Sequence, residues 1–201
     1  MKMPPRDERN AAQIIRVDGR NCFAELKNDS FAIGKVHMEF AQYDTARPEG
    51  QRFTNHVHIY LDNAEFLTLA HEAQCGSLHM RMKKAKETGE SKPLYESLGG
   101  TPAETLKQQG KARADGMSLS RCMKLFAGSK ADYLLCAESG AGERDAKGLI
   151  VPRNGTNPEQ RVSVPLSWRD FNKLTLITQA HIQAWLASCY SSASTQRLGT
   201  N

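Results

Sequence analysis

Hydrophobic and polar residues alternate in two short stretches of the chain, as they do in half-buried strands. In residues 36–40 the even positions are apolar, and in residues 57–61 the odd positions are apolar with His58 and Tyr60 between them. Other runs rich in apolar, aromatic and β-branched residues are bounded by polar, Gly- or Pro-containing turns. The pattern predicts strands at 22–26, 31–43, 53–61, 118–126, 133–138, 148–152 and 161–166.

Two helices are predicted where the apolar spacing changes from every second residue to every third or fourth. After the strand at 53–61, Asp62 and Glu65 form an acidic variant of the capping box, and helical spacing follows to residue 76 and resumes to 86. After the strand at 161–166, Ser167 and Asp170 begin a closing helix in the same way. Each predicted helix therefore follows a predicted strand directly.

Residues 88–116 interrupt this pattern with prolines and glycines, in a basic part of the chain. Between residues 81 and 130 there are 11 Lys or Arg and 5 Asp or Glu, so that the rest of the chain, whose total net charge is +5, carries −1. A loop of this length in a compact domain is more often functional or partly disordered than merely connecting. Within it we predict one short helix at 101–109, with Thr101 as its cap and Pro102 at the first helical position.

The two strand-cap-helix segments can be aligned at a constant offset of 105 residues, residues 56–62 on 161–167. The strand face, the cap and the apolar stripe of the helix stay in phase, which favours an internal repeat. We therefore predict an α+β fold built from two repeats of an antiparallel sheet followed by a helix. The identical positions are Val57/Val162, Leu61/Leu166, Phe66/Phe171 and Leu69/Leu174.

The repeat leads to a division of the chain into five parts. Residues 1–20 are predicted to be a flexible basic arm, in which Arg6, Arg9, Arg16 and Arg20 could grip a phosphate backbone. The first sheet-helix half is expected at 21–87, the basic insertion loop at 88–116, the second four-strand-plus-helix half at 117–190 and a polar tail at 191–201.

Composition restricts the classes of protein to be considered. A chain of 201 residues with 39% hydrophobic and 24% charged residues can bury a core without disulfides or metal. Its five cysteines are widely spaced and form no CxxC pair, and neither a signal peptide nor a run of about 20 apolar residues is present. We expect a cytoplasmic protein without a membrane segment, either a monomer with internal pseudo-symmetry or a homo-oligomer.

The arrangement resembles a known family of single-stranded-DNA-binding proteins, which includes the eukaryotic positive transcriptional coactivator and the plant Whirly proteins. The local match is Arg161-Val162-Ser163-Val164-Pro165-Leu166-Ser167-Trp168-Arg169-Asp170-Phe171, a short strand followed by a capping Ser and an acidic, aromatic helix start. The resemblance implies a Whirly-like pseudo-twofold arrangement of two four-strand-plus-helix units. Proteins of that fold usually pair two chains, whereas here one chain would supply both halves.

The resemblance implies a non-catalytic protein that binds single-stranded DNA or RNA with little sequence preference, in replication, recombination or transfer of a mobile element. Such binding combines cations for the phosphates with rings on which bases stack. Because the basic excess lies in the insertion and the start of the second half, we expect that half to dominate. The candidate residues are Lys35, His37, Tyr43, Arg52, His58, Tyr60, Lys111, Arg113, Arg121, Lys124, Phe126, Lys130 and Tyr133.

The sequence predicts no catalytic residues, cofactor or metal. There is no GxSxG elbow, and the glycine-rich segment 139–144 lacks a closing GK[ST]. His56 and His58 would face the same way on a strand, but no third ligand stands at a persuasive spacing, and Gly76 interrupts the series His71, Cys75, His79. Two alternatives remain: an interaction module or inhibitor that docks on a protein partner through 88–116, and a metal-dependent hydrolase.

Overall fold

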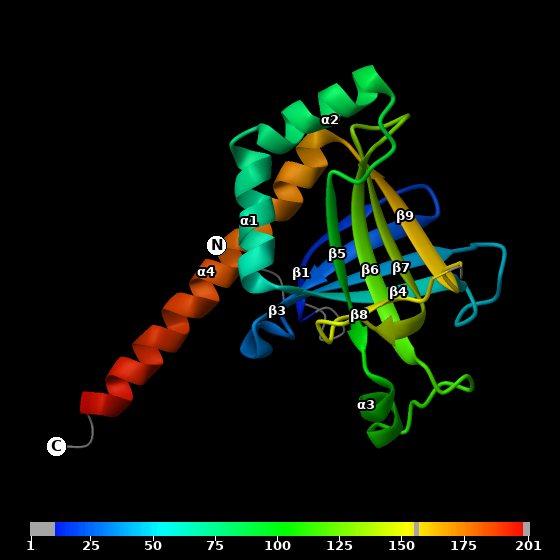
Figure 1. Ribbon diagram of the computed structural model, residues 1–201. Coiled ribbons are helices and arrows are strands. Elements are labelled where there is room, and N and C mark those ends of the chain that lie inside the picture. The colour runs from blue at the N-terminus through cyan, green and yellow to red at the C-terminus, as the bar shows by residue number, and fades with distance from the viewer. Residues whose placement is uncertain (1–10, 155–156, 199–201) are drawn as a thin grey trace.

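The computed structural model describes residues 11–154 and 157–198, with side chains of the last helix described to Ser191. Within these residues the chain forms two antiparallel sheets and four α-helices, so the α+β class is confirmed at this level. Figure 1 shows the strands of one sheet running across those of the other, with three helices gathered on one side. Arg6 and Arg9 of the predicted arm lie outside the described residues.

The first sheet is a four-stranded meander in the order β1-β2-β3-β4. Its first strand covers part of the segment predicted as a flexible arm. That part belongs to the fold, because Ile14 is buried in the core and the strand pairs with its neighbour. A short 3₁₀ turn (Phe31–Ile33) occupies the beginning of the stretch predicted as a strand from residue 31. The strands are β1 (Gln13–Asp18), β2 (Cys22–Lys27), β3 (Lys35–Tyr43) and β4 (Phe53–Asp62).

The helix α1 (Asn63–Gln74) follows β4 directly, and α2 (Ser77–Thr88) follows α1. They are separated at Gly76, which has a φ of 82°. A positive φ is accessible to glycine at little cost, so the predicted interruption and resumption of the helix occur at this residue.

The second sheet contains β5 (Tyr95–Thr101), β6 (Ser118–Ala127), β7 (Tyr133–Arg144), β8 (Ile150–Pro152) and β9 (Gln160–Leu166). Strands β8 and β9 pair with successive parts of the same edge of β7, so together they act as one interrupted fourth strand. The expectation of a loop at 88–116 was wrong for residues 95–101, because β5 pairs with β6. The short helix predicted within this segment at 101–109 is confirmed as α3 (Ala103–Gln108). Strand β5 was not predicted, because Pro93 and the two adjacent glycines are residues typical of loops.

The long helix α4 (Trp168–Leu198) closes the chain. Its first part packs against α1 and β1, and its second part extends away from the body (Figure 1). The polar tail expected from residue 191 begins as part of this helix. Of the helices that the described residues form, none combines the length and the apolar character needed to cross a membrane.

One hydrophobic core joins the inner faces of both sheets to α1, α2 and α4. The eight residues matched at an offset of 105 all lie in it, each no more than 3% exposed. Helices α1 and α4 begin at Asn63 and Trp168, which have the same offset. The core thus covers the inner faces of both sheets, so we look for a binding site on their polar outer faces.

Of the three predicted helix caps, the structure confirms the one at Ser167. Ser167 caps α4 as expected, because its Oγ accepts the Asp170 N–H at 3.1 Å and donates to the Asp170 carboxylate at 2.6 Å. Asp62 forms no side-chain cap and instead accepts a hydrogen bond from Lys35 at 2.7 Å, on the paired strand. Thr101 does not cap α3 either, since its hydroxyl accepts a bond from Arg121 at 2.6 Å.

Candidate nucleic-acid interface

A row of aromatic and imidazole rings runs along the outer face of the first sheet, mainly on its edge strand β4. Phe53 stacks on His56 with centroids 5.4 Å apart, and His56 lies 4.4 Å from His58. His58 lies 5.1 Å from His37, which stacks on Tyr60 at 4.6 Å and 13°. Phe53 and Tyr60, at the two ends, are 55% and 44% exposed. We call these five residues the ring row.

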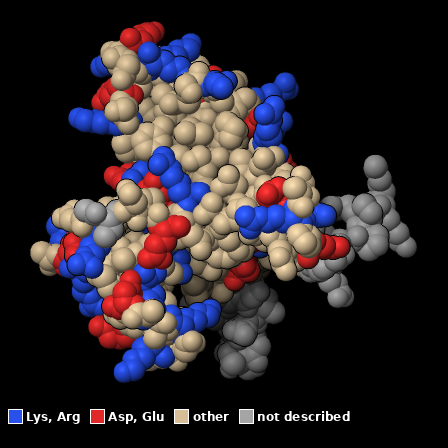
Figure 2. All heavy atoms as spheres, turned by 90° about the vertical axis from the view of Figure 1, so that its right-hand side faces the viewer, with Lys and Arg blue, Asp and Glu red and all other residues tan. Residues whose placement is uncertain are grey.

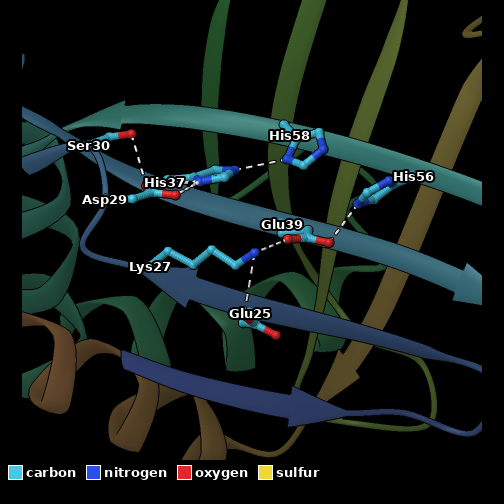
Figure 3. Close-up of polar contacts among 8 residues, drawn as sticks. All are labelled: Glu25, Lys27, Asp29, Ser30, His37, Glu39, His56 and His58. Atoms are coloured by element: carbon cyan, nitrogen blue, oxygen red, sulfur yellow. Dashed lines mark hydrogen bonds and ion pairs between the residues drawn. The ribbon is translucent and has the colours of Figure 1, made fainter. Parts of the chain in front are cut away.

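Hydrogen bonds hold the imidazoles of the ring row in place (Figure 3). His37 Nδ1 lies 2.9 Å from the Asp29 carboxylate, and His37 Nε2 lies 2.9 Å from His58 Nδ1. His56 Nε2 lies 2.7 Å from Glu39 Oε1, on β3. Burial, together with the nearby charges of His56 and His37, lowers the pKa of His58 to about 4, so that this ring is neutral near pH 7.

Lys27 and Glu39 form an ion pair on the same outer face of the first sheet, and Glu25 lies 3.5 Å from the Lys27 ammonium group. Burial by itself would lower the pKa of Lys27, but the hydrogen bond to Glu39 and the charges of Glu39 and Glu25 outweigh it and raise that pKa. For Glu39, burial opposes ionisation, but the bonds from Lys27 and His56 hold its pKa below the ordinary value. Both groups are therefore charged at neutral pH.

A groove of about 870 Å³ begins where the ring row ends, between the edge strands β4 and β5. Tyr60 belongs to both, and Tyr95 lies on the opposite side of the groove. Burial raises the pKa of Tyr95 to about 12, so its hydroxyl stays protonated. Three cations line the groove, Lys35, Lys111 and Arg121, together with three carboxylates, Asp62, Glu65 and Glu96.

Arg121 is the most unusual of these cations. It comes from the core-facing side of β6, and its Nη1 donates to the Thr101 hydroxyl at 2.6 Å. Burial lowers its pKa, and among the described residues no carboxylate forms an ion pair with it. A half-buried guanidinium without a direct ion pair favours the binding of an anion beside it.

The remaining predicted residues of the first half lie near the row. Tyr43 is half-buried and pairs with Phe53 across the strands, and the exposed Arg52 precedes Phe53, with its Nε donating to the Arg47 carbonyl at 3.3 Å. At the same end the Arg16 guanidinium lies 3.7 Å from the centre of the Phe23 ring. Cations are thus present at both ends of the ring row.

In the second half, the predicted residues are dispersed. Lys124 pairs with Glu138 at 3.0 Å and lies 3.7 Å from Glu96, while Phe126 is half-buried further along the same face of β6. Lys130 is exposed in the turn after β6. On the face seen in Figure 2, Lys and Arg side chains lie beside Asp and Glu almost everywhere, around a broad area with neither.

Three predicted contacts require correction. Tyr133 is 1% exposed and packs on Phe171 in the core, so it offers no surface for a base. His37 is 6% exposed beneath Tyr60 and supports that ring. Arg113 is already neutralised, because it bonds Asp115 and donates to Glu159 at 3.0 Å.

Two important residues were missed by sequence reasoning. Glu39 was recognised only as a polar position on its strand, although it lies opposite His58 in the strand register. Phe53 was out of phase with His56 and His58, but a register irregularity at Gln42/Tyr43 brings it to the same face. The available signal for the second was an aromatic residue at the first position of the strand predicted at 53–61.

Comparisons of this chain with models of known protein families, with curated proteins and with solved structures gave no match.

Proposed function

We propose that this protein binds single-stranded nucleic acid, DNA or RNA, without catalysing a reaction on it. The observation that carries the proposal is the ring row, with exposed Phe53 and Tyr60 at its ends. Successive bases stack on such rings whatever their sequence, because every base has a π face. Phe53 and Tyr60 are seven positions apart along the strand, which corresponds to roughly 23 Å.

Phosphates would be neutralised from both ends of the row. Arg16 and Lys35 are already paired with Asp18 and Asp62. The cations left for phosphates are Arg52, next to Phe53, and Arg121 and Lys111, in the groove beside Tyr60. These cations would displace counterions from the strand, so binding should weaken as salt rises. A strand along β4 would therefore pass from an aromatic surface into a groove where Arg121 forms no ion pair with a described carboxylate.

This proposal places the stacking rings on the first half, and it takes cations from both halves, because Arg121 lies on β6. Lys124 of the second half and Arg113 of the segment 88–116 each have carboxylate partners within the protein. A phosphate would have to compete with those carboxylates, whereas Arg121 has no such competitor among the described residues. The number of cations in a stretch of sequence is therefore a weaker guide to a phosphate-binding site than the number that form no ion pair in the structure.

We also infer that the two halves are related by a pseudo-twofold axis, as in the Whirly-like arrangement. Gln74 of α1 donates a hydrogen bond to Gln179 of α4, and these residues differ by 105 in number. When a residue contacts its own repeat equivalent, the contact lies at the axis. The equal helix starts and the eight matched core residues support the same inference.

The function is tested by adding the full chain to a labelled oligothymidine of 20 nucleotides at low salt and measuring fluorescence anisotropy. Truncation of one stacking ring typically costs about 1–3 kcal/mol. We therefore expect Phe53→Ala and Tyr60→Ala each to weaken binding by roughly 5-fold to 150-fold. Arg121→Gln should weaken binding and also reduce its dependence on salt.

Tyr190→Ala is the matched control, because Tyr190 is 75% exposed on α4, away from the ring row. It should bind like the unchanged protein. No binding at low salt, or equal binding by the Phe53, Tyr60 and Tyr190 variants, would contradict the proposal. Competition with duplex of the same length should displace the labelled strand poorly, since paired bases cannot stack on protein rings.

A further inference from the structure

Glu39, His56 and His58 have the composition and spacing of a metal site. One ligand atom from each lies within 4.8 Å of the others. Two come from β4 and the third from the paired strand β3, and Figure 3 shows them turned to one another on the sheet. Strand pairing thus provides the third ligand that the spacing of His56 and His58 along the chain did not.

The hydrogen bonds behind His58 select the nitrogen that it presents. When His37 donates from Nδ1 to the Asp29 carboxylate, Nε2 of the same ring is free to accept a hydrogen bond. His58 Nδ1, 2.9 Å away, must then donate to His37 Nε2. With its proton held on Nδ1, His58 has its lone pair on Nε2, the tautomer that binds a metal through this atom.

The distances require only small side-chain rotations. His56 Nε2 and Glu39 Oε1 are 2.7 Å apart in a hydrogen bond. Ligands at roughly 2.0–2.2 Å around a tetrahedral ion lie about 3.4 Å from each other. The bond between His56 and Glu39 would open slightly, His58 would move inward, and Lys27 could stay on the other oxygen, Glu39 Oε2.

The charge of the surroundings also favours a divalent cation. Glu25 and Glu39 both lie beside the Lys27 ammonium group, and Asp29 lies beside His37; among the described residues no other Lys pairs with these three carboxylates. Three carboxylates and one ammonium group leave two formal negative charges. The guanidinium of Arg16, on the neighbouring strand, is already bonded to Asp18 at 2.7 Å.

We propose that Glu39, His56 and His58 form a binding site for a divalent transition metal, with Zn²⁺ the best match to two imidazoles and one carboxylate. The fourth position would face solvent, because the His56 side chain is 36% exposed. Three protein ligands and one open position are typical of zinc that binds water or an external ligand. Asp29 and His37 are positioning residues that orient His58 from behind.

Equilibrium dialysis of chelator-treated full-length protein against Zn²⁺ measures the stoichiometry. We expect one tightly bound Zn²⁺ per chain, and the same value for the control variant His71→Gln, which changes an exposed histidine on α1. Glu39→Gln and His58→Gln should weaken binding at least 10-fold. His37→Gln keeps all three ligands but should still weaken binding roughly 10-fold to 100-fold, through loss of orientation.

Because a ligand variant could fail to fold, the unchanged protein provides a second readout. ¹⁵N NMR of its imidazoles should show Zn²⁺-dependent shifts at Nε2 of His56 and His58, with His71 and His181 unchanged. Failure of the folded, unchanged protein to bind Zn²⁺ overturns the proposal. So does a stoichiometric Zn²⁺ whose shifts fall on His71 or His79, near Cys75.

Discussion

Single side chains in this protein often find partners on a neighbouring strand in place of the local backbone. Asp62 stands at the start of α1, where a carboxylate is a favourable cap, yet it pairs with Lys35. The strand register sets Lys35 directly opposite Asp62. A charged partner at hydrogen-bond distance competes successfully with the neutral N–H groups of the helix end.

The five cysteines differ in what surrounds them. Cys22, Cys122 and Cys136 are buried, and burial raises the pKa of Cys122 to about 12. Cys75 and Cys189 are exposed, and the hydrogen bond between Cys75 Sγ and the Ser77 hydroxyl contributes most to lowering the pKa of Cys75. Since the thiolate is the nucleophile, the exposed thiols should react first.

We predict that iodoacetamide at neutral pH modifies Cys75 and Cys189 in the folded protein and leaves the other three cysteines intact. Peptide mapping by mass spectrometry measures the order of modification. Ser77→Ala should slow modification of Cys75 without affecting Cys189. Early modification of Cys122 in folded protein would disprove this account of the surface thiols.

At the scale of elements, a carboxylate and guanidinium cluster ties the segment after α3 to the start of β9. Arg113 bonds both Asp115 and Glu159, and their hydrogen bonds to Arg113 hold the pKa values of both carboxyl groups below the ordinary range. Glu159 lies immediately before β9, where the interrupted fourth strand of the second sheet resumes. We expect the cluster to fix that resumption.

The lowered pKa values predict the direction of a pH effect on stability. Each carboxyl group contributes stability above its unfolded pKa, near 4, and loses it as pH falls through the lower folded pKa. The free energy of unfolding should therefore fall below about pH 4 more steeply in the unchanged protein than in Arg113→Met. For Glu159, which is largely exposed, the effect should be at most about 1 kcal/mol.

Urea titrations at pH 6 and pH 3 measure this difference. The matched control is Arg144→Met, since Arg144 is exposed and its ion pair with Glu104 is a long 3.7 Å. Its pH dependence should equal that of the unchanged protein. If Arg113→Met also behaves like the unchanged protein, the cluster has no role in stability.

At the scale of the whole molecule, both sheets contribute to one core. Phe66 of α1 and Phe171 of α4 are 1% and 2% exposed, in the same cluster of buried residues. A continuous core makes the two halves unfold together, even though each has its own sheet. The pseudo-symmetry proposed above would then describe geometry and not independent stability.

We predict that Phe66→Ala and Phe171→Ala each lower the free energy of unfolding by about 3–5 kcal/mol. Urea unfolding should show one transition, with coincident curves from circular dichroism and from the fluorescence of Trp168 and Trp185 on α4. Met80→Ala, at a residue 71% exposed, should change stability by less than about 0.5 kcal/mol. A Phe66→Ala transition that leaves the tryptophan signal unmoved would show two independent halves.

Local patterns predicted much of the secondary structure because they depend on neighbours along the chain. Alternation placed Val57 and Leu61 on the inner face of a strand, and the break at Gly76 lies between the two helices where it was expected. Strand β5 was missed because Gly99 and Gly100 carry no side chain to show alternation. A Cβ at Gly100 would lie 2.2 Å from the Leu119 carbonyl oxygen and 2.7 Å from Ile150, so tight packing requires this glycine.

The sequence by itself determined the inward positions of the two matched strand-helix segments, where helices follow strands, and the phase shared by segments 105 residues apart. Only the tertiary structure decided which polar residues meet. Glu39 reaches His56 through strand register, and Arg121 lies beside Tyr60 because the two sheets cross. Such contacts depend on the pairing of distant segments, which no periodicity along the chain records. The candidate sites of this protein consist of those contacts.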